Sequence, residues 1–219
     1  MGSSKNTILC FGGNSHIAKA FFERFSDNYN IINVTKKGID GLTLDFSCDR
    51  EVETFIKKID FRIDGILFCQ GINPRYNLVD TTYEHSRLMM DINVTIPLLL
   101  IKGLKNFMNE NCCVIFLSSI AKRKGSYDPT YAAAKSAITG LIQSLANFCP
   151  KIRFNQLTLG LVEDSPVQNT MTPDFVKKHT DRMQNNKLVQ TKDVVEMINQ
   201  ILFNESLNRA DINLDRGYI

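Results

Sequence analysis

The sequence predicts an α/β fold, a doubly wound, Rossmann-like parallel sheet of about seven strands with helices on both faces. Two observations predict it. Short apolar runs alternate with longer amphipathic runs along the chain. The apolar runs are rich in Ile, Val, Leu, Phe and Cys and do not alternate with polar residues, which is typical of strands buried on both faces. The chain has 219 residues and no repeat or linker, so we expect a single domain over residues 1–219.

The elements follow in chain order from these two patterns. The apolar runs predict strands at 7–11, 31–35, 42–46, 65–69, 113–117, 152–159 and 212–214. The amphipathic runs predict helices at 15–25, 50–59, 83–108, 129–148, 173–184 and 191–203. The third helix is long, and we expect Pro97 to bend or interrupt it.

Composition excludes several classes of function. The net charge is +3 and the basic residues are scattered, so neither nucleic acid nor a membrane surface is an expected partner. No run approaches the roughly 20 apolar residues of a membrane span, and the start of the chain does not resemble a signal peptide. The six cysteines include no CxxC pair, and no histidines stand at ligand spacing. We therefore expect reduced thiols, no metal site and a cytoplasmic location.

The turn after the first strand is a candidate anion site. Residues 8–20 lead from a strand through a glycine turn into a helix, whose free N–H groups suit a dinucleotide pyrophosphate. Gly12 and Gly13 permit a tight turn, and Ser15 can cap the helix. The strict G-x-G-x-x-G pattern is not met, so an ordinary strand-to-helix turn remains the alternative.

A second candidate site follows the strand that ends in Ser118 and Ser119. Tyr131 and Lys135 lie four residues apart and therefore share one helix face. A nearby ammonium lowers the pKa of a phenol from about 10, and such a phenol can exchange a proton with an alcohol or carbonyl oxygen. The alternative is a surface helix that carries a Tyr and a Lys one turn apart.

The end of the second strand bears on the choice of dinucleotide. In dinucleotide-binding folds an acid at this place binds the 2′-hydroxyl of NAD, whereas a basic residue accommodates the 2′-phosphate of NADP. Here the strand ends in Thr35, Lys36 and Lys37, without an acid. NADP(H) is therefore favoured over NAD(H), and a solvated lysine pair is the alternative.

Together these segments resemble the short-chain dehydrogenase/reductase family along essentially the whole chain, and in particular its compact 3-oxoacyl-carrier-protein reductases. Eight degenerate motifs occur in the family's order: the turn at 11–18, Asp45, Gln70-Gly71, Asn93, Ser118-Ser119, Tyr131 with Lys135, the segment 153–160 and the tail 214–218. His16 and Ala18 replace two glycines of the family turn, and we expect a changed path of the turn near the pyrophosphate.

The resemblance implies a role for each matched residue. Tyr131 would be the catalytic acid and base, and Lys135 would lower its pKa and hold the nicotinamide ribose. Ser119, or alternatively Ser118, would hydrogen-bond the substrate oxygen, and Asn93 would hold a water that connects Lys135 to solvent. The implied cofactor-binding residues are Gly12, Asn14, Ser15, His16, Ile17, Thr35, Lys36, Lys37, Asp45, Phe46, Gln70, Gly71, Tyr131, Lys135, Gly160 and Val162.

The implied function is hydride transfer between NADP(H) and a carbonyl or secondary alcohol, on a small-molecule or carrier-bound substrate. Residues 161–190 would form the lid over that substrate, and helices 83–108 and 129–148 would support a homodimer or homotetramer. Reduction of a sugar-nucleotide ketone in polysaccharide synthesis and a non-catalytic dinucleotide sensor or scaffold are the alternatives. His85 and His179 stand alone on polar stretches, so we expect both at the surface.

Overall fold

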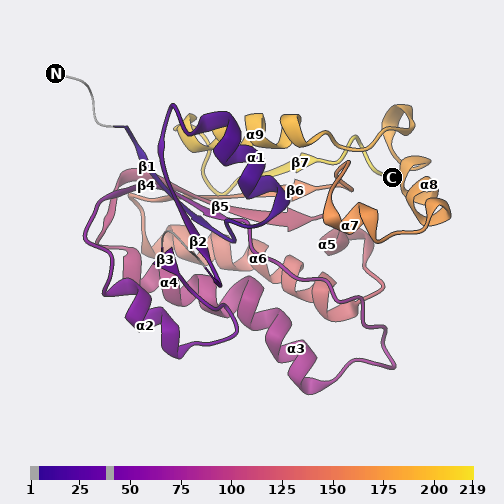
Figure 1. Cartoon of the computed structure of the whole chain (residues 1–219), viewed down its shortest axis with the longest axis horizontal. Coiled ribbons are helices and arrows are strands. Elements are labelled where there is room, and N and C mark those ends of the chain that lie inside the picture. Colours follow the sequence, from indigo (N-terminus) through magenta and orange to yellow (C-terminus); the bar gives the residue numbers. More distant parts are fainter. Residues whose placement is uncertain (1–4, 38–41) are drawn as a thin grey trace.

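The computed structural model describes residues 5–37 and 42–219 and contains a seven-stranded sheet in the order β3-β2-β1-β4-β5-β6-β7 (Figure 1). All neighbouring strands pair in parallel. The strand order reverses between β1 and β4, which confirms the predicted doubly wound sheet. The strands are β1 Thr7–Phe11, β2 Asn30–Thr35, β3 Leu42–Thr43, β4 Ile63–Phe68, β5 Met108–Ser119, β6 Arg153–Leu159 and β7 Asp211–Leu214.

Helices cover both faces of the sheet (Figure 1). One face carries α1 (His16–Phe25) and α9 (Thr191–Phe203). The other carries α2 (Arg50–Ile56), α3 (Tyr83–Met90), α4 (Ile96–Leu104) and α6 (Pro129–Phe148). The short helices α5 (Ala121–Lys124), α7 (Pro166–Asn169) and α8 (Pro173–Thr180) lie beyond the carboxyl ends of β5 and β6, and a 3-10 turn (Gln184–Asn186) precedes α9. Among the described helices, none has the length and apolar character to cross a membrane.

Each face of the sheet has its own hydrophobic core. Leu9 and Phe11 of β1 point into the core on the side of α2, α4 and α6. Ile8 and Cys10 point into the opposite core, under α1 and α9. This double burial is the reason why the strand sequences lack polar alternation. The four cysteines expected in strands are buried free thiols: Cys10, Cys69, Cys112 and Cys113.

The helix predicted over 83–108 is interrupted, as expected, but the break precedes Pro97 and the helix ends earlier than predicted. The segment divides into α3, a π-helical turn (Asp91–Thr95) and α4, with Pro97 in the first turn of α4. The helix also ends at Leu104, and Met108 already belongs to β5. A π-helical turn adds a residue to the helix and changes which side chains face inward. Asn93, inside this turn, is thereby buried against α6.

Candidate active site

A cavity of about 480 Å³ opens at the carboxyl edge of the sheet, where the strand order reverses. This is the place at which doubly wound sheets bind ligands, because the loops after neighbouring strands diverge there. Segments far apart in the sequence form its wall. The lining residues on which the following paragraphs depend are Asn14, Ser15, His16, Ile17, Gln70, Gly71, Asn73, Arg75, Ser118, Ser119, Lys124, Tyr131, Lys135, Gly160, Val162, Phe175 and His179.

The turn after β1 brings the start of α1 to this cavity. Gly12 has φ +75°, and its backbone approaches β4 so closely that an added Cβ would lie 2.6 Å from the Gln70 nitrogen. The amides of Gly12 and Gly13 both donate to the Val34 carbonyl, at 3.0 and 3.1 Å. The Ser15 hydroxyl caps α1 by accepting from the Ala18 amide at 3.3 Å. The turn therefore presents a capped helix start with positive partial charge to the cavity, as predicted.

Both positions at which this chain departs from the family turn lie inside α1. His16 is the first residue of α1, and Ala18 is fully buried within the same helix, so neither position needs the freedom of glycine. The His16 imidazole instead hydrogen-bonds Thr191 at the start of α9, with Nε2 2.7 Å from Oγ1. His16 thus ties the start of α1 to the start of α9.

We expect Gly12→Ala to lower the free energy of unfolding by roughly 2–4 kcal/mol, because the new methyl meets backbone and the positive φ is strained. Urea unfolding measures the change. Gly140→Ala is the matched control, since Gly140 lies in α6 with nothing within 4 Å of its added Cβ. The control should be neutral or stabilising by about 1 kcal/mol. Equal destabilisation of both variants would contradict the close approach at Gly12.

The start of α6 places the predicted phenol and ammonium together. Pro129 opens the helix, and the Asp128 carboxylate accepts from the Tyr131 amide at 3.0 Å. Tyr131 is half-buried in the cavity wall, and the Lys135 Nζ lies 5.8 Å from its ring centroid. Lys135 also donates to the Leu117 carbonyl at 2.9 Å. The structure thus confirms that the two side chains share one face at the end of β5.

Burial governs the proton equilibria of this pair. Burial raises the pKa of Tyr131 above 10.0; a hydrogen bond with Ser119 opposes this shift and the negative charge of Asp128 adds to it. Burial also lowers the pKa of Lys135 to about 8, with Cys69 acting in the opposite direction. The expectation that the pKa of Tyr131 lies below its ordinary value is therefore wrong, because desolvation and Asp128 together outweigh the opposing effect of Ser119.

The two candidate serines differ in their surroundings. Ser119 acts to lower the pKa of Tyr131, and its hydroxyl accepts from the Ala121 amide at 3.2 Å. The Ser118 hydroxyl is buried and has no hydrogen-bond partner among the described residues. Both line the cavity, and the effect on the pKa of Tyr131 favours Ser119.

Several buried polar atoms around the cavity have no partner in the described part of the chain. A Cβ added to Gly71 would lie 3.7 Å from Lys135 Nζ and 3.9 Å from Asn93 Oδ1, so these two atoms gather at Gly71. Asn93 donates to the Met89 carbonyl at 2.9 Å, which leaves its Oδ1 free to accept. The unpartnered atoms near the cavity are Gln70 Oε1, Asn73 Oδ1, Asn93 Oδ1 and Ser118 Oγ. Buried polar atoms normally have partners, so this set fits a polar ligand or an ordered water.

Seven of the predicted site residues lie outside the cavity lining: Gly12, Thr35, Lys36, Lys37, Asp45, Phe46 and Asn93. Lys36 pairs with Asp45 at 2.7 Å. Partial burial would raise the pKa of Asp45, but hydrogen bonds from Lys36 and Ser47 outweigh it and lower the pKa to about 2. Phe46 is buried and packs edge-on against Phe11, with ring centroids 5.7 Å apart, so it belongs to the core.

The prediction that His85 is a surface residue is wrong. His85 is buried, and its Nε2 donates to Asp128 Oδ2 at 3.0 Å. Thr130 donates to Asp128 Oδ1 at 2.6 Å, so one fully buried carboxylate joins α3 to the start of α6. The Asp-Pro pair before α6 is a helix-start signal that could have identified Asp128. His179 is half-buried on α8 and lines the cavity.

The segment after Gly160 forms one side of the cavity, where we expected the lid. Arg75 has φ 63° and connects this segment to the loop after β4. Its guanidinium donates to the Val167 carbonyl at 3.0 Å, the Thr170 carbonyl at 3.2 Å and the Thr170 hydroxyl at 2.7 Å. These bonds hold α7 over the cavity from the opposite wall.

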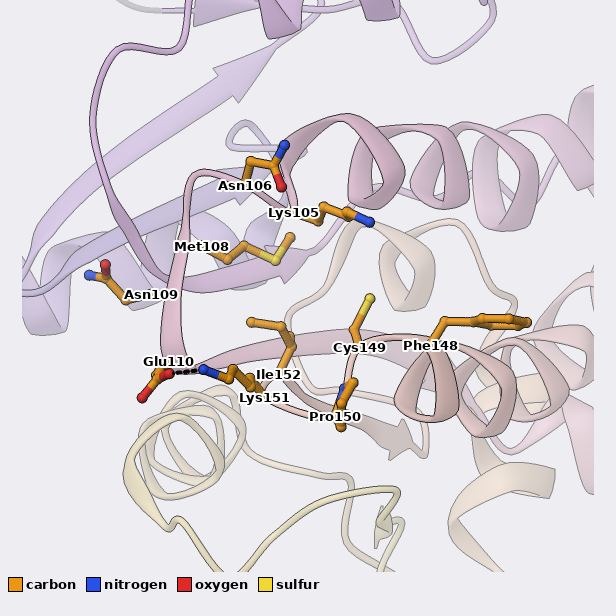
Figure 2. Close-up of a pocket in the computed structure, with 10 residues that line it drawn as sticks. All are labelled: Lys105, Asn106, Met108, Asn109, Glu110, Phe148, Cys149, Pro150, Lys151 and Ile152. Atoms are coloured by element: carbon orange, nitrogen blue, oxygen red, sulfur yellow. Dashed lines mark hydrogen bonds and ion pairs between the residues drawn. The ribbon is translucent and has the colours of Figure 1, made fainter.

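A second, smaller cavity of about 280 Å³ lies at the other edge of the sheet, where β5 and β6 begin (Figure 2). Figure 2 shows the ion pair of Glu110 with Lys151 at one end of this cavity and Phe148 at the other. None of the predicted catalytic residues lines it. The cavity at the carboxyl edge is therefore the candidate active site.

Comparisons with known proteins give a consistent result. A family model described as Enoyl-(Acyl carrier protein) reductase matches residues 33–218. The short-chain dehydrogenase/reductase FrzI from Cladobotryum sp. is 32% identical over 108 residues, which span 48% of this chain and 41% of that relative. The chain thus matches less than half the length of this curated relative.

Two solved structures share the fold. A 4-hydroxyisoleucine dehydrogenase complexed with NADH superposes with a TM-score of 0.86 at 16% identity, covering 97% of this chain and 98% of that chain. The angucycline C-6 ketoreductase LanV with bound NADP superposes with a TM-score of 0.85 at 15% identity, covering 97% of this chain and 95% of that chain. At such identities the likeness establishes the fold, and one structure holds NADH while the other holds NADP.

Proposed function

The chain belongs to the short-chain dehydrogenase/reductase family of oxidoreductases, and from this premise we propose that it transfers a hydride between a nicotinamide dinucleotide and a carbonyl or secondary alcohol. The observation that carries the proposal is one cavity that gathers the capped start of α1, Ser119, Tyr131 and Lys135. The start of α1 and Lys135 are more than a hundred residues apart in the sequence. Their convergence in one cavity places the Tyr131 phenol beside the start of a helix that suits an anion.

The chain fits a dinucleotide on its own residues. The N-terminus of α1 suits the pyrophosphate, because free N–H groups and the helix dipole attract an anion. Lys135 and the unpartnered Asn93 Oδ1, which meet at Gly71, suit the ribose hydroxyls and a bridging water. When bound, the dinucleotide supplies the hydride to the carbonyl carbon or accepts it from the alcohol.

The protein's own residues handle the substrate oxygen. In the reductive direction Tyr131 donates its phenolic proton to that oxygen, while Ser119 hydrogen-bonds the same atom and stabilises its developing negative charge. The positive charge of Lys135 stabilises the phenolate that remains. Solvent returns a proton to Tyr131, and the products are the alcohol and the oxidised dinucleotide. The high pKa of Tyr131 favours its protonated form, which is the form that donates.

We further propose NADP(H) as the preferred dinucleotide. Thr35, Lys36 and Lys37 end β2 without an acid, and both lysines are exposed. Lys36 is partly neutralised by Asp45, so Lys37 is the stronger candidate for the 2′-phosphate. The exposed positive charges suit a phosphate, whereas the ribose hydroxyl of NAD gains little from them.

We expect NADPH to bind at least tenfold more tightly than NADH in titration calorimetry, and Lys37→Gln to reduce the preference about tenfold. Lys57→Gln, at an exposed position next to α2, is the charge-matched control and should leave both affinities unchanged. Tighter binding of NADH by the unaltered protein would contradict the preference for NADP(H).

Turnover is tested with a panel of ketones and aldehydes, followed by loss of the nicotinamide absorbance. Activity on simple carbonyls would support the proposal over the sugar-nucleotide reductase and over the non-catalytic sensor. Dinucleotide binding without turnover on any class, keto-sugars included, would favour the sensor. We propose the cytoplasm as its location and a homodimer or homotetramer as its assembly. The exposed apolar side chains on the helices concerned, Tyr83, Leu98 and Phe148, support an assembly that light scattering can test.

A further inference from the structure

The candidate active site has an unbalanced charge. Among the described residues that line the cavity, none is an aspartate or a glutamate. The same lining includes the cations Arg75, Lys124 and Lys135 together with His16 and His179. Lys135 belongs to the proposed catalytic group and His16 to the start of α1. Arg75, Lys124 and His179 lie on the substrate side and have no role in the proposed hydride transfer.

Lys124 is placed for contact with a substrate. It ends α5, between Ser119 and Tyr131 in sequence, and all three residues line the cavity. Its Nζ lies 5.6 Å from the centroid of the Tyr218 ring, near the end of the chain. The neighbouring cations are neutralised, since Lys122 pairs with Asp211 and Arg123 with Asp215. Lys124 has no carboxylate partner among the described residues.

His179, on the lid helix α8, lines the same cavity as Lys124. Burial lowers its pKa, a hydrogen bond with the Phe175 carbonyl opposes this, and the charges of Lys124 and Arg182 lower it further. The His179 ring lies 5.9 Å from the Tyr218 ring and 4.8 Å from the Phe175 ring, measured between centroids. Lys124 and His179 thus both lie near the Tyr218 ring, and the lowered pKa of His179 leaves its ring ready to gain a proton beside an anion.

We propose that the substrate is anionic, a carbonyl or hydroxy compound with a carboxylate on an apolar body, and that Lys124 and His179 bind this carboxylate. The inference rests on the proposed function and specifies its substrate class. A carboxylate beside the unpaired Lys124 gains a favourable charge interaction, and the same negative charge favours protonation of His179. Charge-assisted hydrogen bonds to a carboxylate are also about twice as strong as neutral ones.

The apolar residues of the lining suit the apolar body of such a substrate. The lining also includes an apolar set from α5, α7 and the lid: Ile120, Ala121, Val167, Met171 and Phe175. A short hydrocarbon body would pack there, with its reacting carbon at Tyr131 and its carboxylate at α8. Arg75 already uses three of its hydrogen bonds to hold α7, so it contributes positive potential more than a direct contact.

The test compares oxo acids of increasing chain length with their methyl esters as substrates. We expect kcat/KM to be at least tenfold higher for the acids, and Lys124→Gln to remove most of that preference by lowering the value for acids alone. Lys178→Gln, which removes the same charge from an exposed position of α8 outside the cavity lining, should change neither value. Equal rates for acids and esters, or an equal loss for both in Lys124→Gln, would overturn the inference.

A binding measurement separates this inference from the proposed function. Hexanoate and hexanamide differ in charge and little in shape, so calorimetric titration of the protein with each probes the site without turnover. We expect tighter binding of hexanoate, weakened at least fivefold by Lys124→Gln and by high salt. The affinity for hexanoate should rise as pH falls, because His179 becomes protonated. His179→Gln should remove this rise. Equal binding of both probes would refute the anion site even if the enzyme reduces ketones, whereas hexanoate binding without any turnover would refute only the proposed function.

Discussion

Replacing Tyr131 with phenylalanine is expected to reduce kcat by roughly 10²–10⁴-fold, which is the usual contribution of a positioned general acid. The reason is geometric. The phenol lies in the cavity wall, in contact with Ser119 and with Lys135 near its ring, so no other described side chain replaces its proton. Turnover is measured by the nicotinamide absorbance under saturating substrate, and dinucleotide affinity by calorimetry. The dinucleotide affinity should change by about fivefold at most, which corresponds to the net free energy of one hydrogen bond.

Tyr127→Phe is the matched control for this experiment. Tyr127 also lines the cavity, and its replacement likewise removes a phenolic hydroxyl. In Tyr127 this hydroxyl accepts from the Asn77 side-chain amide at 3.1 Å. Its side chain is mostly exposed, so we expect a change in kcat of about threefold or less, the scale of a weak surface hydrogen bond. A Tyr131→Phe enzyme that keeps its full rate would rule out the proposed proton transfer, whatever the control does.

Replacing Asp128 with asparagine is expected to lower the free energy of unfolding by roughly 2–4 kcal/mol at pH 7. Its carboxylate is fully buried and accepts from His85, from Thr130 and from the amide of Tyr131. The amide of asparagine keeps the shape but presents an N–H group where an acceptor is required. Urea unfolding at several pH values measures the effect.

The pH dependence of this variant has a definite sign. Burial acts to raise the pKa of Asp128, but the bonds from Thr130, Tyr131 and His85 outweigh it, so its pKa in the folded protein is lowered. The stabilisation is therefore fully present above the pKa of the unfolded chain, near 3.9, and is lost as pH falls through the folded value. The difference between the two proteins should shrink below about pH 4.

Asp181→Asn serves as the control for Asp128→Asn. Asp181 forms an exposed pair with Lys177 four residues away, at 2.7 Å, so its loss should cost about 0.5 kcal/mol or less. If the two variants lose similar stability, the buried carboxylate does not anchor α6. If the stability difference between Asp128→Asn and the unaltered protein stayed the same at low pH, the lowered pKa of Asp128 would be contradicted.

Much of the fold could be predicted from the sequence because it depends on local patterns. The unalternated strands, the glycine turn before α1 and the four-residue spacing of Tyr131 and Lys135 each follow from the residues themselves. Gly12 is the clearest case, since its positive φ and its approach to Gln70 exclude any side chain.

The rest depended on contacts between segments that no local pattern encodes. The π-helical turn that buries Asn93, the pairing of Lys36 with Asp45 and the burial of His85 against Asp128 all require the packed structure. The same is true of the Tyr131 pKa, because desolvation by the folded protein raised it against the prediction. A sequence specifies which groups a chain has and which neighbours share a helix face. Only the tertiary structure decided which charges are buried, paired or left to face one another, since electrostatic free energies depend on distance and exposure to water.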